Sequence, residues 1–190
     1  NLEVVLTVFT RWLKPLLNFQ KVSIAYYGYF LEIYTLVKTT SKFPKSIRST
    51  LWSKAFGRVV PMVGTANIRY LEVDKDHVTV RIENQRNMQN HIKGVHAAAM
   101  ALLAETATGF LTGLHIPDDR ILLIKSLHVD YLKVAQGGLT ATATLSADQQ
   151  TCIADNEKGA LLIPVTVIDD PGNEPIQCQM LWAWLPKRKK

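Results

Sequence analysis

The sequence predicts an α+β fold in which a curved antiparallel sheet wraps around one long central helix. Two strand-like segments with alternating polarity are followed by one apolar helix and then by four further strand-like segments. The helix is apolar on nearly all sides, so nearly all of its surface needs to be buried. This is possible only if the sheet encloses most of the helix. With 190 residues, 47% of them hydrophobic, the chain has enough apolar mass for one main domain with an appendage.

The first 58 residues are expected to form a helical extension of that domain. Residues 2–16 carry apolar side chains at spacings of three and four, as in an amphipathic helix. The apolar run at 22–37 is sixteen residues long and contains Glu32, so it is shorter than the roughly 20 residues that span a bilayer. A short helix around 47–56 follows, with Ser46 or Ser49 as its predicted N-cap. This extension packs on the domain or on a partner, lies at a membrane surface, or is a targeting or expression remnant.

The main domain is expected to span residues 59–186, with 187–190 as a basic tail. Residues 65–73 and 77–83 alternate apolar and polar around a polar turn, which predicts a hairpin. Residues 94–114 are rich in Ala and Leu and free of Pro, which predicts the central helix. Four strands are then expected at 121–134, 139–145, 160–168 and 175–184, the last two joined by a strong turn at 169–173. A sheet curved around a single helix in this way is a hotdog fold.

The charge distribution argues against nucleic-acid binding. Residues 1–58 carry a net charge of +7, residues 59–186 carry −5, and the tail adds +4. The folded body is therefore acidic and offers no basic face for a phosphate backbone. Two cysteines and no closely spaced Cys/His cluster predict neither a disulfide framework nor a metal site. Secretion is not expected, whereas mitochondrial and cytoplasmic locations both fit the basic, apolar N-terminus.

Polar residues gather where the central helix begins, and one carboxylate lies inside it. The backbone N–H groups of His96 and Ala97 are expected to be unpaired donors reinforced by the helix dipole, able to polarise a carbonyl. Glu105 lies in an apolar run and is able to activate water or attack directly. Nine residues separate His96 from Glu105, roughly 13 Å at 1.5 Å per residue. A site that uses both ends therefore needs a second subunit, with two helices side by side and antiparallel.

This stretch resembles the hotdog-fold acyl-CoA thioesterases, the 4-hydroxybenzoyl-CoA and PaaI-like superfamily, over about residues 59–185. The resemblance is carried by Asn90, by Gly94-Val95-His96, by Leu103-Ala104-Glu105 and by the strand at 129–135. It implies that Asn90 holds the attacking water or the thioester and that His96 orients the helix start. It also implies that Ala97 gives an oxyanion-hole N–H and that Glu105 is the base or nucleophile from the partner chain. Many relatives have Gly where this chain has Ala97, and many PaaI-like members have Asp where it has Glu105.

The resulting hypothesis is metal-independent hydrolysis of an acyl-CoA or a similar thioester by a homodimer or a dimer of dimers. Coenzyme A enters as part of the substrate, with Lys125 and Lys133 as candidate contacts to its phosphates. Simpler roles stay open, since Asn90 suits a turn and His96 suits a helix cap. The alternative function is that of a catalytically inactive hotdog-fold structural or binding subunit of a larger assembly, possibly mitochondrial and membrane-associated, docked through residues 1–58. A membrane-surface enzyme for long-chain acyl groups is a third hypothesis.

Overall fold

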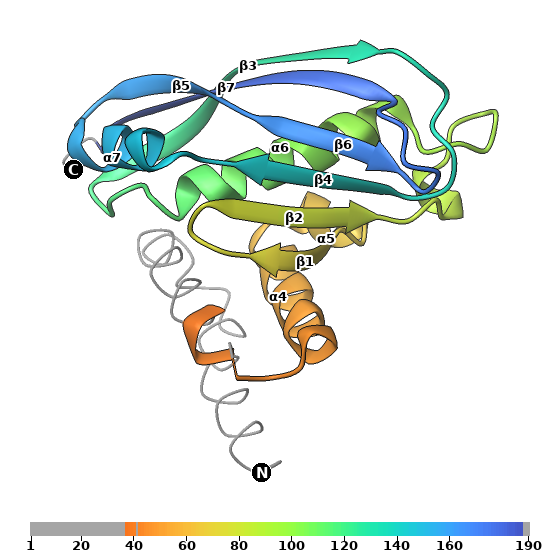
Figure 1. The fold of residues 1–190 in the computed structure, drawn as a ribbon, viewed down its shortest axis with the longest axis horizontal. Helices are drawn as coiled ribbons and strands as arrows, with labels where there is room; N and C mark the ends of the chain where they lie inside the picture. The colour runs from red at the N-terminus through yellow and green to blue at the C-terminus, as the bar shows by residue number, and fades with distance from the viewer. Residues whose placement is uncertain (1–36, 41, 188–190) are drawn as a thin grey trace.

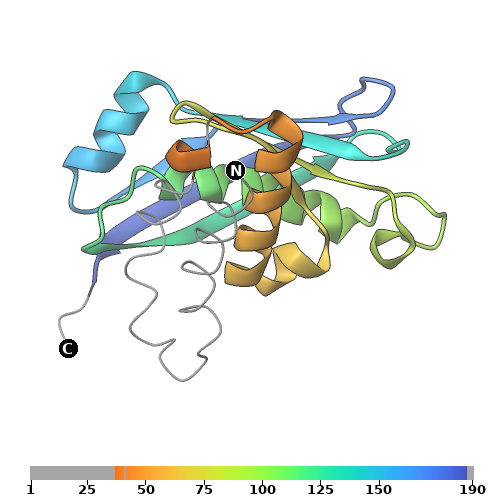
Figure 2. The same ribbon diagram turned by 90° about the horizontal axis from the view of Figure 1, so that it is seen from below.

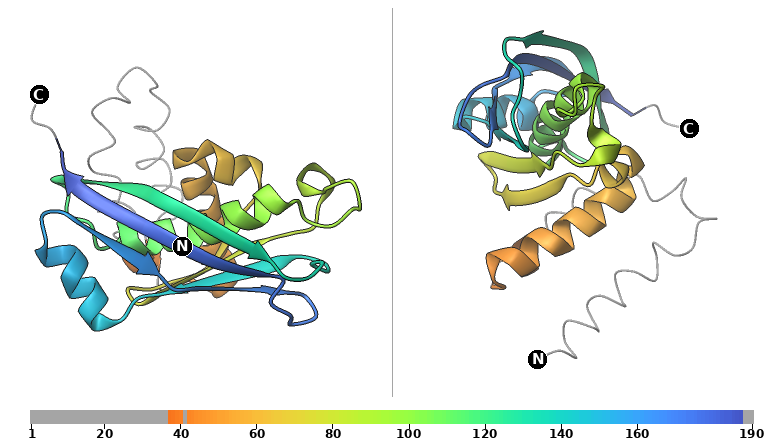
Figure 3. Two further views of the ribbon diagram at one scale, coloured as in Figure 1. Left: turned by 90° about the horizontal axis from the view of Figure 1, so that it is seen from above. Right: turned by 90° about the vertical axis from the view of Figure 1, so that its right-hand side faces the viewer.

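One long helix, α6 (Ala97–Gly113), lies inside two antiparallel sheets that curve around it (Figure 1). The structure is a computed structural model that describes residues 37–40 and 42–187. Seen nearly along α6, the strands surround the helix on most sides (Figure 3, right). This arrangement confirms the predicted hotdog fold. The helices predicted within residues 1–36 lie outside the described residues.

The first sheet has the strand order β1-β2-β4-β6. Its strands are β1 (Arg69–Val73), β2 (His77–Ile82), β4 (Leu139–Thr144) and β6 (Val165–Asp169). Every second side chain of β2 and β4 is buried, as their alternating sequences predict. The buried positions of β4 are Leu139, Ala141 and Ala143, and these small alanines allow α6 to approach the sheet closely. The predicted hairpin is confirmed as β1 and β2, although β1 begins four residues later than expected.

The second sheet has the order β3-β7-β5, which leaves β3 at its edge. Its strands are β3 (Arg120–Tyr131), β7 (Ile176–Pro186) and β5 (Gly159–Ile163). Among the described residues, β3 pairs with β7 alone, so the other side of this twelve-residue strand has free backbone groups. A bulge interrupts the β3–β7 register between Ile124 and Ser126.

The strand predicted at residues 160–168 is in fact two strands that belong to different sheets. Pro164 separates β5 from β6 because its ring removes the N–H that a continuous ladder needs. The chain bends there, and β6 pairs with β4 in the first sheet while β5 pairs with β7 in the second. The turn predicted at residues 169–173 is present, and it carries the chain from β6 back to the second sheet.

Helix α4 (Lys45–Val59) packs along β1, the edge strand of the first sheet, and the short α5 (Pro61–Thr65) packs against α4 (Figure 2). Trp52 and Phe56 are the buried residues of α4, and the Phe56 ring packs on Tyr70 of β1 and Phe110 of α6 at centroid distances of 4.6 and 4.5 Å. The prediction of a helix around 47–56 is therefore confirmed, with an earlier start. The predicted serine cap is wrong, because Pro44 occupies the N-cap and makes no side-chain cap hydrogen bond.

The structure contains a helix that the sequence did not predict. Helix α7 (Ala147–Asp155) fills a segment without a predicted element, and Ser146 and Gln149 form a capping box at its start.

The domain boundary predicted between residues 58 and 59 falls just before the last residue of α4. That residues 1–58 form one unit remains a prediction. No helix in the described part of the chain is long and apolar enough to cross a membrane.

Candidate functional site

The first turn of α6 is held by His96, which occupies the N-cap with extended backbone angles. The Nδ1 atom of His96 accepts a hydrogen bond of 3.1 Å from the Ala98 N–H, so the neutral ring carries its proton on Nε2. The expectation that the His96 N–H is unpaired is wrong, since it donates to the Met88 carbonyl at 2.8 Å. That bond belongs to the short ladder in which Val95 pairs with Gln89. His96 therefore fulfils the capping role.

Ala97 supplies the free donor at this helix end. Its side chain is exposed, and its N–H has no acceptor among the residues that the structure describes. The peptide unit that contains this N–H is held in place at its other end, because the His96 carbonyl accepts from the N–H groups of Ala99 at 2.9 Å and Met100 at 3.1 Å. An N–H at the start of a 17-residue helix also carries the positive end of the helix dipole. This group is able to polarise a carbonyl oxygen or to bind an anion.

Tyr131 also contacts this turn, a role that sequence reasoning missed. Its hydroxyl donates to the Ala97 carbonyl at 3.0 Å, although 34 residues separate the two in the sequence. Tyr131 is the last residue of β3, so the helix start is tied to the edge strand of the second sheet. Burial is the larger cause that raises the pKa of the Tyr131 phenol, which keeps it a protonated donor at neutral pH.

Glu105 lies eight residues after Ala97, about 12 Å along the same helix. Its side chain is half-buried, and its carboxylate has neither a hydrogen bond nor an ion pair within the described part of the chain. Desolvation raises the pKa of this carboxyl above its usual range. The neighbouring Tyr70 has a raised pKa too, first because of its burial and second because of the Glu105 charge. A carboxyl group of this kind is a stronger base than a surface glutamate.

The face of α6 that carries Glu105 is the one that the sheets leave open. One turn after Ala98 come Ala101 and Leu102, and one further turn on comes Glu105; each of these four residues is exposed or half-buried. The remaining helix positions after residue 98 are mostly buried against the two sheets. The expectation of burial on nearly all sides therefore holds except along this stripe.

Asn90 closes the loop that precedes the helix. Its Oδ1 atom accepts from the N–H groups of Ile92 and Gly94 at 3.0 and 3.1 Å, and its own N–H donates to the Gly94 carbonyl at 2.8 Å. The side-chain oxygen is thus used by the turn, which is the simpler of its two expected roles. Within the part of the chain that the structure describes, the Nδ2 group of Asn90 makes no hydrogen bond and is left to donate to water or to a substrate.

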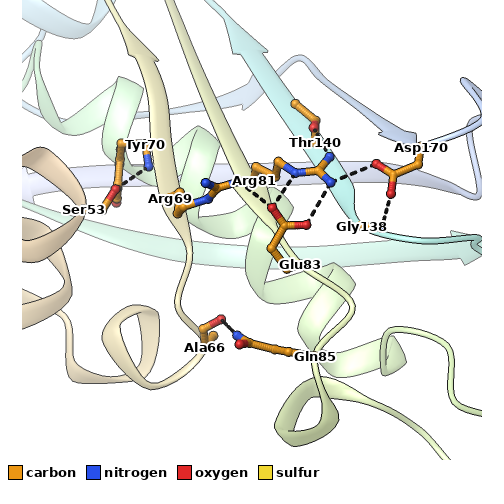
Figure 4. A network of polar contacts seen from close by, with 10 residues as sticks. All are labelled: Ser53, Ala66, Arg69, Tyr70, Arg81, Glu83, Gln85, Gly138, Thr140 and Asp170. Carbon is orange, nitrogen blue, oxygen red and sulfur yellow. Dashed lines mark hydrogen bonds and ion pairs between the residues drawn. The ribbon is translucent and has the colours of Figure 1, made fainter. Parts of the chain in front are cut away.

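A network of ion pairs and hydrogen bonds lies at the end of β2, near the start of β4 and the turn after β6 (Figure 4). The Arg81 guanidinium of β2 binds both Glu83 Oε2 and Asp170 Oδ1 at 2.9 Å, while Asp170 Oδ2 accepts from the Gly138 N–H at 2.8 Å. The Arg81 hydrogen bond lowers the pKa of Glu83, and the Gly138 N–H is the first cause of the lowered pKa of Asp170. A side chain at position 138 would meet the Arg81 guanidinium at 2.5 Å, which only glycine avoids. The network therefore joins β2 to the start of β4 and to the turn after β6.

Lys125 and Lys133 are both exposed, Lys125 at the β3 bulge and Lys133 two residues beyond the end of β3. Their predicted role toward phosphates stays a prediction. Among the described residues, no group of three or more His, Cys, Asp or Glu side chains is placed to hold a metal ion.

The family of the chain follows from a match over most of its length. Residues 48–185 match the model of a domain of unknown function, DUF4442. The chain belongs to the DUF4442 family. The match begins within α4 and covers the central helix and nearly all of both sheets, including every candidate site residue. Among curated proteins, no sequence matches this chain significantly.

Solved structures similar to this DUF4442 protein include several thioesterases. A Pseudomonas aeruginosa protein of unknown function, described as a probable thioesterase, is 18% identical with a TM-score of 0.63; the similarity covers 71% of this chain and 93% of that one. A thioesterase from Haemophilus influenzae is 13% identical with a TM-score of 0.55, covering 77% and 94%. A thioesterase family protein from Silicibacter pomeroyi is 13% identical with a TM-score of 0.56, covering 71% and 96%. The shared feature is the hotdog fold.

Proposed function

We propose that this DUF4442 protein hydrolyses acyl thioesters, with the Ala97 N–H of one protomer and Glu105 of a second protomer acting on the same substrate. One observation carries the proposal: among the described residues, the first N–H of the central helix has no acceptor and the half-buried carboxylate of Glu105 has no counter-charge. A purely structural role leaves the desolvation of Glu105 uncompensated. The thioesterases that share the fold support the choice of reaction.

The chemistry requires one donor and one base. The Ala97 N–H binds the thioester carbonyl oxygen and stabilises the negative charge that develops on it. Glu105 accepts a proton from water while the water oxygen attacks the carbonyl carbon, and the tetrahedral intermediate then expels the thiolate, which takes that proton from Glu105. The alternative is direct attack by the carboxylate, followed by hydrolysis of the resulting anhydride. In either route the C–S bond breaks and a carboxylic acid and a thiol leave.

A dimer is part of this proposal because one protomer keeps the two groups about 12 Å apart. The free edge of β3 is suited to antiparallel pairing with a second β3, which removes the unpaired backbone groups. Exposed apolar residues of β3 flank that edge, and they are Ile121, Leu123, Ile124 and Leu127. Two such protomers would bring the uncovered faces of their α6 helices side by side and antiparallel. Each Ala97 would then lie near the Glu105 of the partner subunit.

Coenzyme A thioesters are the proposed substrate class. Lys125 and Lys133 are exposed on and just after β3, and their positive charges would attract the phosphates of coenzyme A. The exposed methyl group of Ala97 narrows the approach of the acyl group compared with a glycine at the same position.

The first test is thiol release from short-, medium- and long-chain acyl-CoA substrates by wild type, Glu105→Ala and Ala97→Pro. Proline suits the first position of a helix, where its missing N–H costs no intrahelical hydrogen bond, so Ala97→Pro deletes the proposed donor and preserves the helix. The extended backbone of His96 is compatible with a following proline. Ala97→Gly is the matched control because it retains the N–H.

We expect Glu105→Ala and Ala97→Pro each to lower kcat by about 100-fold or more, and Ala97→Gly to keep a kcat within about tenfold of wild type. Equal folding and oligomeric state are established first. Turnover that survives Glu105→Ala contradicts the assignment of the carboxylate. No wild-type turnover on any substrate favours instead the inactive structural or binding subunit, docked through residues 1–58.

A further inference from the structure

The peptide unit between Ala97 and Ala98 is held at both of its polar ends. Its N–H, on Ala98, donates to Nδ1 of His96 at 3.1 Å. Its carbonyl oxygen, on Ala97, accepts from the Tyr131 hydroxyl at 3.0 Å. The two partners come from opposite directions in the sequence, one from the cap itself and one from the end of β3. This peptide lies directly beside the Ala97 N–H proposed to bind the thioester.

Of the groups that anchor this helix start in the described part of the chain, Tyr131 alone belongs to β3. The other anchors are the His96 cap and the hydrogen bond from the His96 N–H to Met88, both from the loop before the helix. Tyr131 is in register with Ile176 of β7, so its backbone is fixed by the sheet on one side. On its other side lies the strand edge through which dimerisation is proposed.

We propose that Tyr131 is a positioning residue of the thioesterase site, whose hydroxyl holds the first turn of α6 so that the Ala97 N–H faces the substrate carbonyl. This inference rests on the proposed function and names a residue that its chemistry does not use directly. The hydroxyl acts through the Ala97–Ala98 peptide and touches neither water nor substrate in the reaction. Because the same residue ends the edge strand, it also links the proposed dimer contact to the geometry of the donor.

The test compares Tyr131→Phe with wild type and with the control Ser126→Ala. Phenylalanine keeps the ring and removes only the hydroxyl, and the half-exposed position tolerates the change. Ser126 lies on the same strand and loses a hydroxyl that makes no hydrogen bond within the described residues. Thermal unfolding and sedimentation establish that all three proteins fold and associate equally.

Two readouts are measured on the full chain. The first is the split between kcat and KM for the best acyl-CoA substrate; we expect kcat to fall about three- to tenfold in Tyr131→Phe with KM within about twofold, as for one uncharged hydrogen bond. The second is hydrogen exchange of the Ala98 amide in the free protein, which we expect to accelerate by a similar factor. Ser126→Ala is expected to change neither readout.

The outcomes separate this inference from the function on which it rests. An unchanged kcat in Tyr131→Phe beside an active wild type overturns the positioning role, and so does a rise in KM alone. If the wild type turns over no substrate, the proposed function fails. The hydrogen-exchange rate of the Ala98 amide in Tyr131→Phe is then the remaining test of the structural contact. Faster exchange then supports Tyr131 as the anchor of the helix start, and unchanged exchange overturns it.

Discussion

Gly109 lies where the central helix meets the second sheet, and replacing it with alanine sets two effects against each other. In an ordinary helix the change stabilises the folded state by about 1 kcal/mol, because alanine has the higher helix propensity. Here a Cβ atom at position 109 would lie 2.5 Å from Cζ2 and 2.6 Å from Cη2 of Trp182. The indole would have to move by about 1 Å to restore an ordinary contact.

The indole is not free to make that movement. Its Nε1 atom donates to Thr108 Oγ1 at 2.9 Å inside the core, and that hydroxyl in turn donates to the Ala104 carbonyl at 2.9 Å. Overpacking costs about 1–3 kcal/mol and a lost buried hydrogen bond about 1 kcal/mol. After subtracting the propensity gain, we expect Gly109→Ala to lower the free energy of unfolding by about 1–3 kcal/mol, or about 2–12 °C in Tm.

A double-mutant cycle with Trp182→Phe identifies the cause. Phenylalanine lacks the part of the indole that holds Cζ2 and Cη2, so it relieves the contact with a Cβ at position 109. Urea unfolding at one protein concentration gives the four free energies, and we expect a favourable coupling of about 1–2 kcal/mol in the double variant. A stabilising Gly109→Ala, or a coupling near zero, would refute the packing argument.

Three further predictions concern the site and its proposed interface. His96→Ala should lower the free energy of unfolding by about 0.5–2 kcal/mol through loss of the cap to Ala98, with His96→Asn closer to wild type; equal urea midpoints for the two variants would contradict the capping role. Because burial raises the pKa of Glu105, its folded state binds a proton that the unfolded chain releases, and stability should fall as pH rises from about 4.3 through the raised value. Glu105→Gln should remove that slope in urea unfolding and be the more stable protein at pH 7, whereas parallel pH profiles would argue against the shift. Leu127→Lys on β3 should shift the protein toward monomer in sedimentation velocity, while Leu162→Lys on β5 should not; identical behaviour of the two would exclude the β3 contact.

The fold was predictable from the sequence because each element has a local signal. The alternation in β2 and the Ala-rich composition of α6 depend on neighbours close in the chain, and the structure confirms both. Pro164 was also visible in the sequence, yet the apolar run around it concealed the division into β5 and β6. Helix α7 was missed because its polar composition outweighed the capping box at Ser146.

The candidate site was predictable only in part, because its geometry depends on contacts between distant segments. The position of His96 at the helix start follows from local capping, and the partial burial of Glu105 follows from the apolar run around it. The hydrogen bond from the His96 N–H to Met88 needs the bridge across the preceding loop, which no local pattern indicates. The contact from Tyr131 to Ala97 needs β3 to end beside the helix, a consequence of the whole sheet.

The central claim is that each site combines the Ala97 donor of one protomer with Glu105 of the other, and subunit complementation tests it most directly. Ala97→Pro and Glu105→Gln proteins, each expected to be inactive as homodimers, are mixed in equal amounts, allowed to exchange subunits and assayed for thiol release. In a mixed dimer with shared sites, one site carries both lesions and the other is intact. Random exchange should then restore about a quarter of wild-type activity, because half of the dimers are mixed and each has one working site. Mixtures that exchange subunits and stay as inactive as the separate variants would contradict the account, since sites contained within one protomer would each keep a lesion.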